Sequence, residues 1–469
     1  MSFLKTFLVF GFLTAYAKSQ SSGQAGSFNA TPEIGEKFGC GSKCQTLINI
    51  ANTADLAITG TAFDFGFYET AANFSFSRPG DLLKLEPMNT SSLDIDYGTS
   101  VYRFQYTTRD QDGSSVPSTG FIAFPFSIPK SGKFRPVVYG HSSVGVSRSC
   151  APSNGPGLFE SAVWGPLVAR GYAIIATDYA GIGNNYTTHK FSNYATHSED
   201  MYYSMVAARA AFPRLFTKEW ASAGVFQGGG GVWKLSEHPL VQHPRSGYLG
   251  GIAVSPSPRL YDYALFSLDT IYTKPDYMDF GATGEIPFAA LAVKRMFPEY
   301  DYHFLGNTLK RRMGLVDELQ LCTNAVLALV LDLPIEELLS VDGLKNDTFF
   351  QQYQRLGGAA NGAKAATPLW VSTGEDDSFL RPYSVLEPAA KTCSYGNKLD
   401  VRVYPGMDHE PTIYASMEDW IPWIEDRFDG IRRPGCCTNI TKTPFNLATA
   451  KKSNVWADYL DIAASIPSD

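Results

Sequence analysis

The chain has 469 residues, of which 44% are apolar and 18% charged, with 42 glycines, 28 prolines and a formal net charge of −7. This length exceeds what one hydrophobic core usually supports, and the apolar content excludes disorder as the main state. The acidic balance, without a cluster of Lys and Arg, argues against a nucleic-acid partner.

The N-terminus has the form of a secretory signal peptide. One positive charge is followed by an apolar run at 7–13 and by Ala15-Tyr16-Ala17, which resembles an A-x-A cleavage site. The run is too short to span a bilayer comfortably, and the longest later run, at 325–331, ends at Asp332. We therefore expect a secreted protein, extracellular or in the lumen of the secretory pathway, without a transmembrane anchor.

Glycosylation and disulfide signals agree with this compartment. Six N-x-S/T sequons favour a glycosylated eukaryotic protein; their asparagines are Asn29, Asn73, Asn89, Asn185, Asn346 and Asn439. Seven cysteines are interpreted as disulfide partners with one thiol left over: Cys40, Cys44, Cys150, Cys322, Cys393, Cys436 and Cys437. A zinc site is the competing interpretation, but no pair of C-x-x-C units exists, so we expect no metal.

Short apolar runs alternate with helical segments along the chain. Runs at 101–108 and 120–125, separated by a turn, predict an antiparallel hairpin. Six further runs predict parallel strands at 136–141, 172–178, 222–226, 251–255, 369–374 and 399–404. Helical segments fit between them, for example at 198–211, and another, at 411–428, follows the last run. This alternation predicts an α/β fold with a mostly parallel sheet covered on both faces.

A long helical stretch interrupts the alternation. Apolar residues recur at helical spacing in 286–297 and 319–331, and no clear strand occurs there. Helices inserted between late strands of such a sheet usually form a cap over the active-site end. We expect these boundaries: signal peptide 1–17, N-terminal arm 18–60 (polar and extended to about residue 38), core 61–257, cap 258–366, core 367–430 and C-terminal extension 431–469.

The segment 220–233 combines an apolar strand, a glycine-rich turn and a helix. That is the frame of the G-x-S-x-G nucleophile elbow, in which a strained turn presents a serine at the carboxyl edge of the sheet. Gly224 and Gly228 occupy the two glycine positions, where larger side chains would clash. The nucleophile position holds Phe226, which cannot attack a carbonyl, so serine-type covalent catalysis is excluded at this position.

Two other interpretations of this segment are weaker. Ser222 could substitute as nucleophile, but it lies inside the predicted strand and not at the turn. The segment could also be a nucleotide-binding glycine loop, but the G-x-G-x-x-G spacing and a ribose-binding acid are not evident. We therefore expect no cofactor.

The other two members of a catalytic triad occur in the expected chain order. The strand at 369–374 is followed by Asp376 and Asp377, where the histidine-orienting carboxylate sits, and Asp377 has the better spacing. His409 follows the strand at 399–404 and precedes the C-terminal helix, which is the position of the catalytic base. A solvated acidic loop and a structural histidine are the alternative interpretations.

The loop after the first parallel strand is a candidate oxyanion site. Related hydrolases have a His-Gly loop here, whose backbone N–H groups help to bind the developing oxyanion. In this chain His141 is followed by Ser142 and Ser143, so serine replaces the permissive glycine. A simple polar turn is the equal alternative.

Together these segments resemble the fungal secretory lipases, the lipase A type of α/β-hydrolase. The resemblance covers roughly residues 62–430 and also rests on PGDLL at 79–83, CAPS at 150–153 and DYAGIG at 178–183. Members of this family hydrolyse lipid esters through Ser, Asp and His beneath a helical cap. By resemblance, Asp377 and His409 carry over as acid and base.

The resemblance also implies further roles. Gln227, next to the nucleophile position, would lend its backbone N–H to the oxyanion site, whereas the nucleophile itself does not carry over. The family suggests a disulfide between Cys150 and Cys322. It also suggests that Cys393 pairs with one of the adjacent cysteines 436 and 437, and Cys40 would then pair with Cys44 or with the leftover thiol of those two.

Three functional hypotheses follow. The first is a lipase-fold protein without acyl-enzyme chemistry that binds or converts a lipid-like or secondary-metabolite small molecule, with His409 and Asp377 as a general base. The second is a secreted lipase or esterase acting on lipid esters. The third is a non-catalytic binding protein on a decayed hydrolase scaffold.

Overall fold

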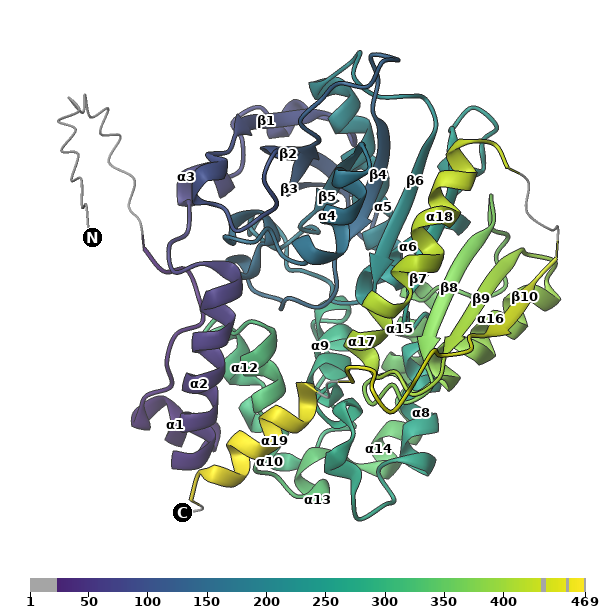
Figure 1. Ribbon diagram of the computed structural model, residues 1–469. Helices are drawn as coiled ribbons and strands as arrows, with labels where there is room; N and C mark the ends of the chain where they lie inside the picture. The colour runs from purple at the N-terminus through teal and green to yellow at the C-terminus, as the bar shows by residue number, and fades with distance from the viewer. Residues whose placement is uncertain (1–22, 432–435, 453–454, 468–469) are drawn as a thin grey trace, which may run out of the picture.

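The computed structural model describes residues 23–431, 436–452 and 455–467, so the expected signal peptide lies outside the described residues. A ten-stranded sheet runs through the molecule in the order β1-β2-β3-β5-β4-β6-β7-β8-β9-β10 (Figure 1). Strands β1 to β3 pair antiparallel and β3 pairs antiparallel with β5, whereas every later pairing is parallel. The predicted α/β fold class is confirmed.

The strands agree with the predicted apolar runs to within a few residues. Their bounds are β1 Leu82–Pro87, β2 Ser100–Arg109, β3 Ser115–Phe124, β4 Arg135–Gly140, β5 Tyr172–Thr177, β6 Trp220–Val225, β7 Tyr248–Val254, β8 Leu369–Gly374, β9 Leu399–Tyr404 and β10 Thr438–Thr441. Strands β1 and β10 were not predicted. Both are edge strands with partly exposed residues, so their sequences lack the buried apolar runs of the central strands.

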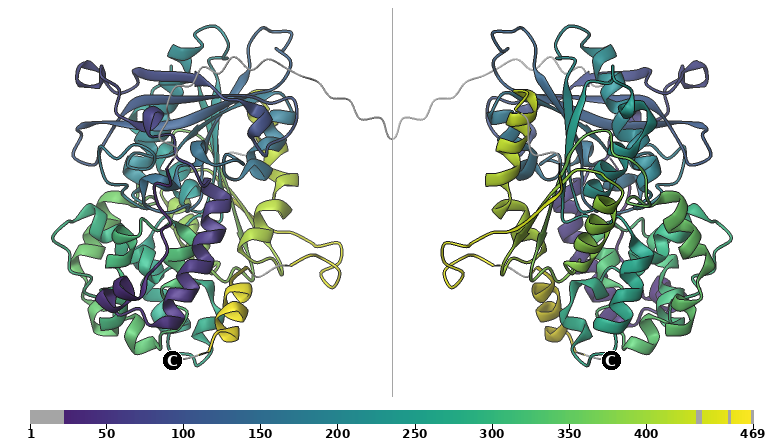
Figure 2. Two further views of the ribbon diagram at one scale, coloured as in Figure 1. Left: turned by 90° about the vertical axis from the view of Figure 1, so that its left-hand side faces the viewer. Right: turned by 90° about the vertical axis from the view of Figure 1, so that its right-hand side faces the viewer.

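The helices of the core cover both faces of the sheet (Figure 2). Their bounds are α3 Phe65–Tyr68, α4 Ser161–Ala169, α5 Tyr194–Ala211, α6 Gln227–Glu237, α7 Pro239–Gln242, α16 Tyr383–Ser394, α17 His409–Ala415 and α18 Met417–Phe428. Residues of α4 and α18 belong to one buried apolar cluster, and residues of α5, α6 and α16 to a second. Coverage on both faces explains why β5, β6 and β8 are buried at every position.

A helical cap lies between β7 and β8 at the carboxyl ends of the parallel strands (Figure 1). Its helices are α8 Leu260–Thr270, α9 Ile286–Met296, α10 Asn307–Arg312, α11 Gly314–Glu318, α12 Thr323–Ala328, α13 Ile335–Leu338, α14 Val341–Lys345 and α15 Thr348–Gly357.

Short 3₁₀ turns occur at Phe74–Phe76, Thr90–Ser92, Arg148–Cys150, Pro152–Asn154, Tyr277–Asp279 and Gly281–Thr283.

The N-terminal arm is helical where an extended segment was expected. Helix α1, Pro32–Phe38, begins after Thr31, whose hydroxyl accepts a hydrogen bond from a backbone N–H, and ends at Gly39 in a left-handed conformation. Helix α2, Ser42–Thr59, packs against α12 of the cap. The arm is helical because its apolar side chains are buried against the cap. The polar sequence of the arm does not by itself indicate this long-range burial.

The C-terminal extension also reaches the cap. Its helix α19 spans Val455–Ser465, and the indole N–H of Trp456 donates to the Met278 carbonyl at 2.6 Å. The predicted helix at 411–428 is two helices, α17 and α18, separated at Ser416. The predicted cap helix at 319–331 is shorter, because only α12 within it is regular.

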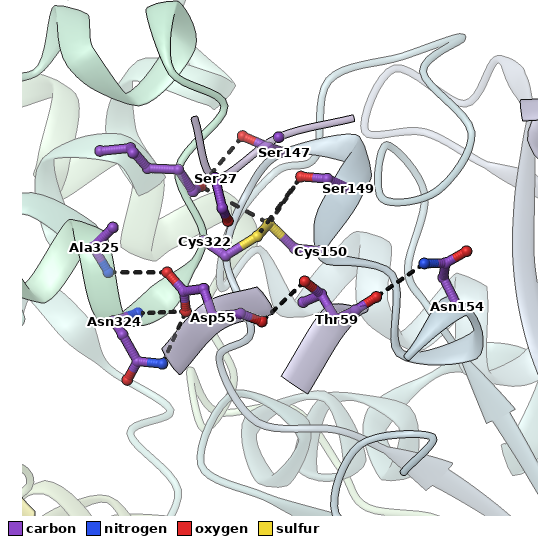
Figure 3. The surroundings of a disulfide bond; sticks show 12 residues. Ser27, Asp55, Thr59, Ser147, Ser149, Cys150, Asn154, Cys322, Asn324 and Ala325 are labelled. Carbon is purple, nitrogen blue, oxygen red and sulfur yellow. Dashed lines mark hydrogen bonds between the residues drawn. A yellow bond between two sulfur atoms is a disulfide. The ribbon is translucent and has the colours of Figure 1, made fainter. Parts of the chain in front are cut away.

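Three disulfides occur in the described residues, and two of them join segments that are 172 and 44 residues apart in the chain. Cys150 pairs with Cys322, Cys40 with Cys44 and Cys393 with Cys437, and Cys436 is the unpaired, exposed cysteine of the described residues. Beside the first disulfide, the buried carboxylate of Asp55 on α2 accepts the backbone N–H groups of Asn324 and Ala325 at 2.9 and 3.0 Å (Figure 3). The core, the arm and the cap therefore meet at this disulfide.

The surface agrees with the compartment signals in the sequence. All six sequon asparagines are exposed in the structure. Within the described ranges, no helix is both long and apolar enough to cross a bilayer. Glycan attachment and secretion remain predictions, for which exposed asparagines and disulfides are the expected setting.

Candidate functional site

The sharp turn between β6 and α6 carries Phe226 at its tip. Its backbone has φ 49° and ψ −108°, which non-glycine residues rarely adopt unless the surroundings hold them there. Its N–H donates to the Val254 carbonyl of β7 at 2.9 Å, and its own carbonyl accepts from Gly230 in α6 at 3.0 Å. The turn thus has the strand–turn–helix form of a nucleophile elbow.

Close backbone packing explains the two glycines that flank the turn. A Cβ on Gly228 would lie 1.9 Å from the carbonyl oxygen of Gly140 at the end of β4. A Cβ on Gly224 would lie 2.5 Å from the backbone of Gly228. Because neither contact is tolerable, glycine is required at both positions whatever side chain stands at the tip.

His409 and Asp377 meet beside this turn. The imidazole Nδ1 lies 2.8 Å from Oδ2 of Asp377, a carboxylate that is fully buried after β8. The other carboxylate oxygen accepts the backbone N–H groups of Phe379 and Leu380 at 3.1 and 2.7 Å. These contacts orient the carboxylate toward the imidazole and leave Nε2 of His409 for another partner.

The charge of Asp377 controls the protonation of His409. Burial by itself would lower the pKa of the imidazole, but the charge and hydrogen bond of Asp377, with further carboxylates nearby, raise it above its ordinary value. The ring of Phe226 stands edge-on to the imidazole, with centroids 5.5 Å apart and an interplanar angle of 87°. The phenyl ring therefore lies beside the imidazole, roughly perpendicular to it.

The two residues considered as alternatives lie elsewhere. Asp376 is exposed, so Asp377 is the acid that contacts His409. Ser222 is buried inside β6, and its hydroxyl is hydrogen-bonded to the Tyr248 hydroxyl at 2.7 Å. Neither the exposed acid nor the strand serine takes part in the arrangement around the turn.

The loop after β4 contains an acid that sequence reasoning missed. Glu160 accepts the backbone N–H of Ser142 at 3.3 Å, the Ser142 hydroxyl, and the Tyr139 hydroxyl at 2.6 Å. Burial raises the pKa of Glu160, although these hydrogen bonds oppose the rise. The N–H and hydroxyl of Ser142 are therefore already bonded to a carboxyl group.

The other members of the loop differ in their surroundings. Both ring nitrogens of His141 face carbonyl oxygens, those of Ser142 at 2.6 Å and Asp178 at 3.3 Å, and burial lowers its pKa to about 4. His141 is thus neutral and buried, and its ring nitrogens contact the backbone. The Ser143 hydroxyl is buried without a hydrogen-bond partner among the described residues.

Gln227 is the first residue of α6. A helix leaves its first N–H groups without partners inside the helix, so the Gln227 N–H is a donor at the turn. Its side-chain oxygen is buried and has no hydrogen-bond partner within the described part of the chain. The N–H of Gln227 thus has no partner inside its helix, whereas the N–H of Ser142 is engaged by Glu160.

A small apolar cavity of about 60 Å³ adjoins the turn, between core and cap. Phe226 forms part of its wall, with aromatic and aliphatic side chains from α8, α9 and the loop before α5. Glu285, at the start of α9, is the ionisable acid in the wall, and burial raises its pKa to about 7. Sequence reasoning missed Glu285 because nothing local marks a cap residue as part of the site.

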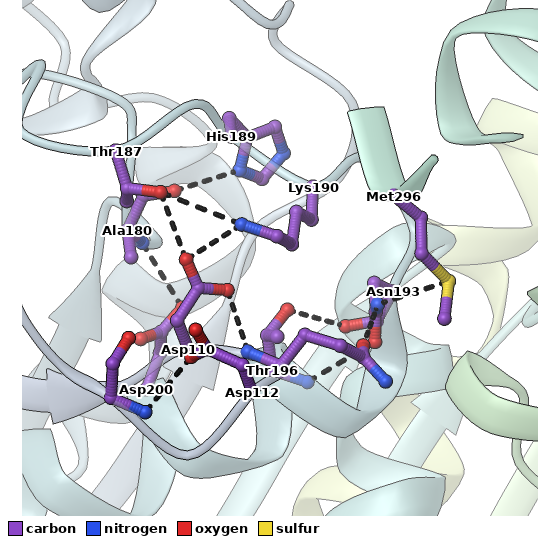
Figure 4. A network of polar contacts seen from close by, with 12 residues as sticks. Asp110, Asp112, Ala180, Thr187, His189, Lys190, Asn193, Thr196, Asp200 and Met296 are labelled. Carbon is purple, nitrogen blue, oxygen red and sulfur yellow. Dashed lines mark hydrogen bonds and ion pairs between the residues drawn. The ribbon is translucent and has the colours of Figure 1, made fainter. Parts of the chain in front are cut away.

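A polar network holds the loop that supplies one wall of the cavity (Figure 4). The Lys190 ammonium donates to Asp110 at 2.6 Å, and the Thr187 hydroxyl donates to the same carboxylate oxygen at 2.9 Å. Asp110 belongs to the turn between β2 and β3, and the loop then presents Phe191 and Ser192 to the cavity. The antiparallel hairpin thereby positions the cavity wall.

Nothing in the described residues gathers three or more His, Cys, Asp or Glu side chains in a geometry that could hold a metal ion. The groups around His409 that carry ionisable protons include the carboxyls of Asp377, Glu160 and Glu285. Their chemistry is proton transfer and hydrogen bonding.

No family model matches the chain, and no curated protein matches it. Solved structures do: the ligand-bound rice cell wall degrading esterase LipA from Xanthomonas oryzae has a TM-score of 0.61 and 15% identity, covering 76% of this chain and 100% of its own. Candida antarctica lipase A has a TM-score of 0.61 and 15% identity, covering 86% of this chain and 93% of its own. This likeness, with the observed sheet order, shows that the chain has the α/β-hydrolase fold.

Proposed function

We propose that the protein is a secreted member of the lipase lineage that lacks acyl-enzyme chemistry and acts on, or binds, a lipid-like or secondary-metabolite small molecule. The observation that carries the proposal is Phe226 at the tip of the elbow turn, 5.5 Å from the His409 ring. A phenyl group forms no ester with a substrate, so the serine of a triad has no counterpart here. That solved neighbours of this fold are a lipase and an esterase supports a lipid-ester ancestry.

The reaction we propose is general-base catalysis without a covalent step. Nε2 of His409 removes a proton from the ligand or from a water molecule, and Asp377 stabilises the imidazolium that forms. The 2.8 Å contact between Nδ1 and the carboxylate supports this role, since it orients the ring and raises the pKa of His409. Burial in an apolar setting favours a ligand with an apolar body.

A small activated ester tests the proposal. With p-nitrophenyl acetate, we expect slow hydrolysis that is linear from the first turnover, because water attacks the ester directly while His409 takes its proton. The His409→Ala variant should lose this rate above background. Intact-mass spectrometry should detect no acyl adduct, and a fluorophosphonate should not label the folded protein.

Two results would decide against the proposal. A burst of p-nitrophenol with fluorophosphonate labelling would establish a covalent nucleophile and hence an ordinary esterase. Equal rates for wild type and His409→Ala, with both proteins folded by circular dichroism, would remove the base and favour the non-catalytic binding protein. Glu336→Gln, an exposed acid of the cap outside the cavity wall, is the matched control.

A further inference from the structure

The cavity beside Phe226 combines an apolar, aromatic wall with one carboxyl group. Its wall is mostly apolar, and Glu285 contributes the carboxyl group in it. Glu285 is half-buried, and no hydrogen bond to its carboxyl is found within the described residues. A partly buried carboxyl that is not bonded to the protein can still accept a hydrogen bond or pair with a cation, so the wall offers a ligand this interaction.

Glu285 interacts with the charge of His409, and further acidic groups surround that imidazole. Charge interactions link His409 to Asp377, Asp408 and Glu285, and also to Glu160. On the positive side, the Arg381 guanidinium donates to the backbone carbonyl of Asp377. Several carboxyls around one imidazole make the site attractive to positive charge and unfavourable for an anion.

The oxyanion side of the turn agrees with this character. In ester hydrolysis, backbone N–H groups there stabilise the negative oxygen of the intermediate. Here the Ser142 N–H and hydroxyl are bonded to Glu160, so an oxyanion would meet a carboxyl in place of free donors. The arrangement penalises an anionic ligand.

Aromatic rings complete the wall. Phe191, Phe226, Tyr263, Tyr272 and Phe304 line the cavity together with Glu285. The faces of aromatic rings attract cations, and a carboxylate among such rings is a recurring way to bind an ammonium group. An alcohol would gain a hydrogen bond from Glu285 but none of this charge attraction.

We infer that the cavity binds an apolar small molecule carrying a basic nitrogen, whose ammonium group is paired with Glu285. This inference takes the cavity of the proposed function as the ligand site and adds the chemical class of the ligand. The volume of about 60 Å³ is below the roughly 150 Å³ of a cavity that holds benzene, so the group seated beside Glu285 is small.

Three probes with the same number of carbons test the inference: n-butylamine, n-butanol and butyrate, titrated by NMR at pH 7.5. We expect the amine to bind at least about tenfold more tightly than the alcohol, because charge-assisted hydrogen bonds are roughly twice as strong as neutral ones. Butyrate should bind more weakly than the alcohol. Glu285→Gln should bring the amine to the affinity of the alcohol, while Glu336→Gln should leave all three unchanged.

A pH series covers the case in which Glu285→Gln fails to fold. The groups that face Glu285 are His409 on α17, Tyr272 after α8 and Tyr194 on α5. Burial raises the pKa of both tyrosines, so they stay neutral in this range. In the His409→Ala variant, amine affinity should rise between pH 5 and 8 as Glu285 ionises, and alcohol affinity should stay flat.

The outcomes separate this inference from the proposed function. Equal binding of amine and alcohol by wild type, a preference that survives in Glu285→Gln, or a flat pH series would overturn the inference. None of these results depends on His409 acting as a base. Conversely, fluorophosphonate labelling would overturn the proposed function while leaving an amine preference intact.

Discussion

The two sides of the site are built on the same structural plan but differ in their chemistry. On one side, the loops after β8 and β9 bring Asp377 and His409 to 2.8 Å, with the carboxylate fully buried and hydrogen-bonded. On the other side, the turn after β6 holds Phe226 in a strained conformation, and the loop after β4 has its Ser142 donors bonded to Glu160. One side has the contacts that the proposed proton transfer needs, and the other carries a phenyl group at the turn and a Ser142 N–H that is already hydrogen-bonded.

This difference teaches that backbone contacts hold the elbow, and that none of those contacts is made by the side chain at its tip. The positive φ of Phe226 follows from close packing of Gly224 and Gly228 against β4 and from the hydrogen bond to Val254. Strain of this kind costs about 1–3 kcal/mol and persists only where the surroundings impose it. The geometry of a nucleophile elbow therefore shows the fold, whereas the side chain at the tip decides the chemistry.

The largest expected effect comes from rebuilding the nucleophile side. Phe226→Ser alone should be labelled slowly by a fluorophosphonate, because Glu160 still engages Ser142. Adding Glu160→Ala should increase the labelling rate about 100-fold, the scale on which a single oxyanion donor acts. Equal rates in the single and double variants, measured by intact mass over time, would show that Glu160 does not block the donors. Phe226→Ser with Glu336→Gln is the control.

The acid–base side should respond to loss of the Asp377 charge. Asp377→Asn should reduce the His409-dependent hydrolysis of p-nitrophenyl acetate by at least about tenfold, because the ring loses its orientation and its imidazolium loses a counter-charge. Asp376→Asn, at the exposed neighbouring acid, should have no effect. A similar loss in both variants would mean that the effect is not specific to the observed hydrogen bond.

The pH profile gives a finer test of the same side. Because the pKa of His409 is raised, its neutral form should accumulate only above the ordinary histidine value of about 6.5. The base-dependent rate should therefore increase with pH through a midpoint above that value, and Asp377→Asn should move the midpoint downward. An NMR titration of the imidazole resonances checks the same shift without substrate, and an unchanged midpoint would contradict it.

The smallest expected effect is on stability. Burial raises the pKa of Glu160 in the folded state, so the unfolded chain ionises first as pH increases. The unfolding free energy contributed by this group should be full below about pH 4.3, the ordinary glutamate value, and should fall as pH approaches the raised folded value. Glu160→Gln should flatten this part of the profile by about 1 kcal/mol or less. Urea unfolding at several pH values measures the difference, and parallel curves for the two proteins would contradict it.

A site residue could be predicted from sequence only where a local motif marks it. Phe226, Asp377 and His409 stand at the ends of apolar runs in a fixed chain order, so their meeting at one edge of the sheet could be inferred from sequence. Glu160 and Glu285 could not, because each reaches the site from a loop or a cap helix without a local motif. The same limit explains α1 and α2, whose helical state depends on burial against the cap.

The sequence by itself determined the fold class, and it predicted helices between the late strands and a phenylalanine at the expected nucleophile position of the elbow. These conclusions follow from local patterns, because strand periodicity, glycine spacing and side-chain chemistry can each be recognised within a short stretch of sequence. Only the tertiary structure decided which acid contacts His409, which cysteine stays unpaired, and what electrostatic character the site has. The electrostatic character of the site depends on the folded arrangement of the chain. Carboxyls that are distant in the sequence act on one imidazole only after folding has brought them together and removed the water between them.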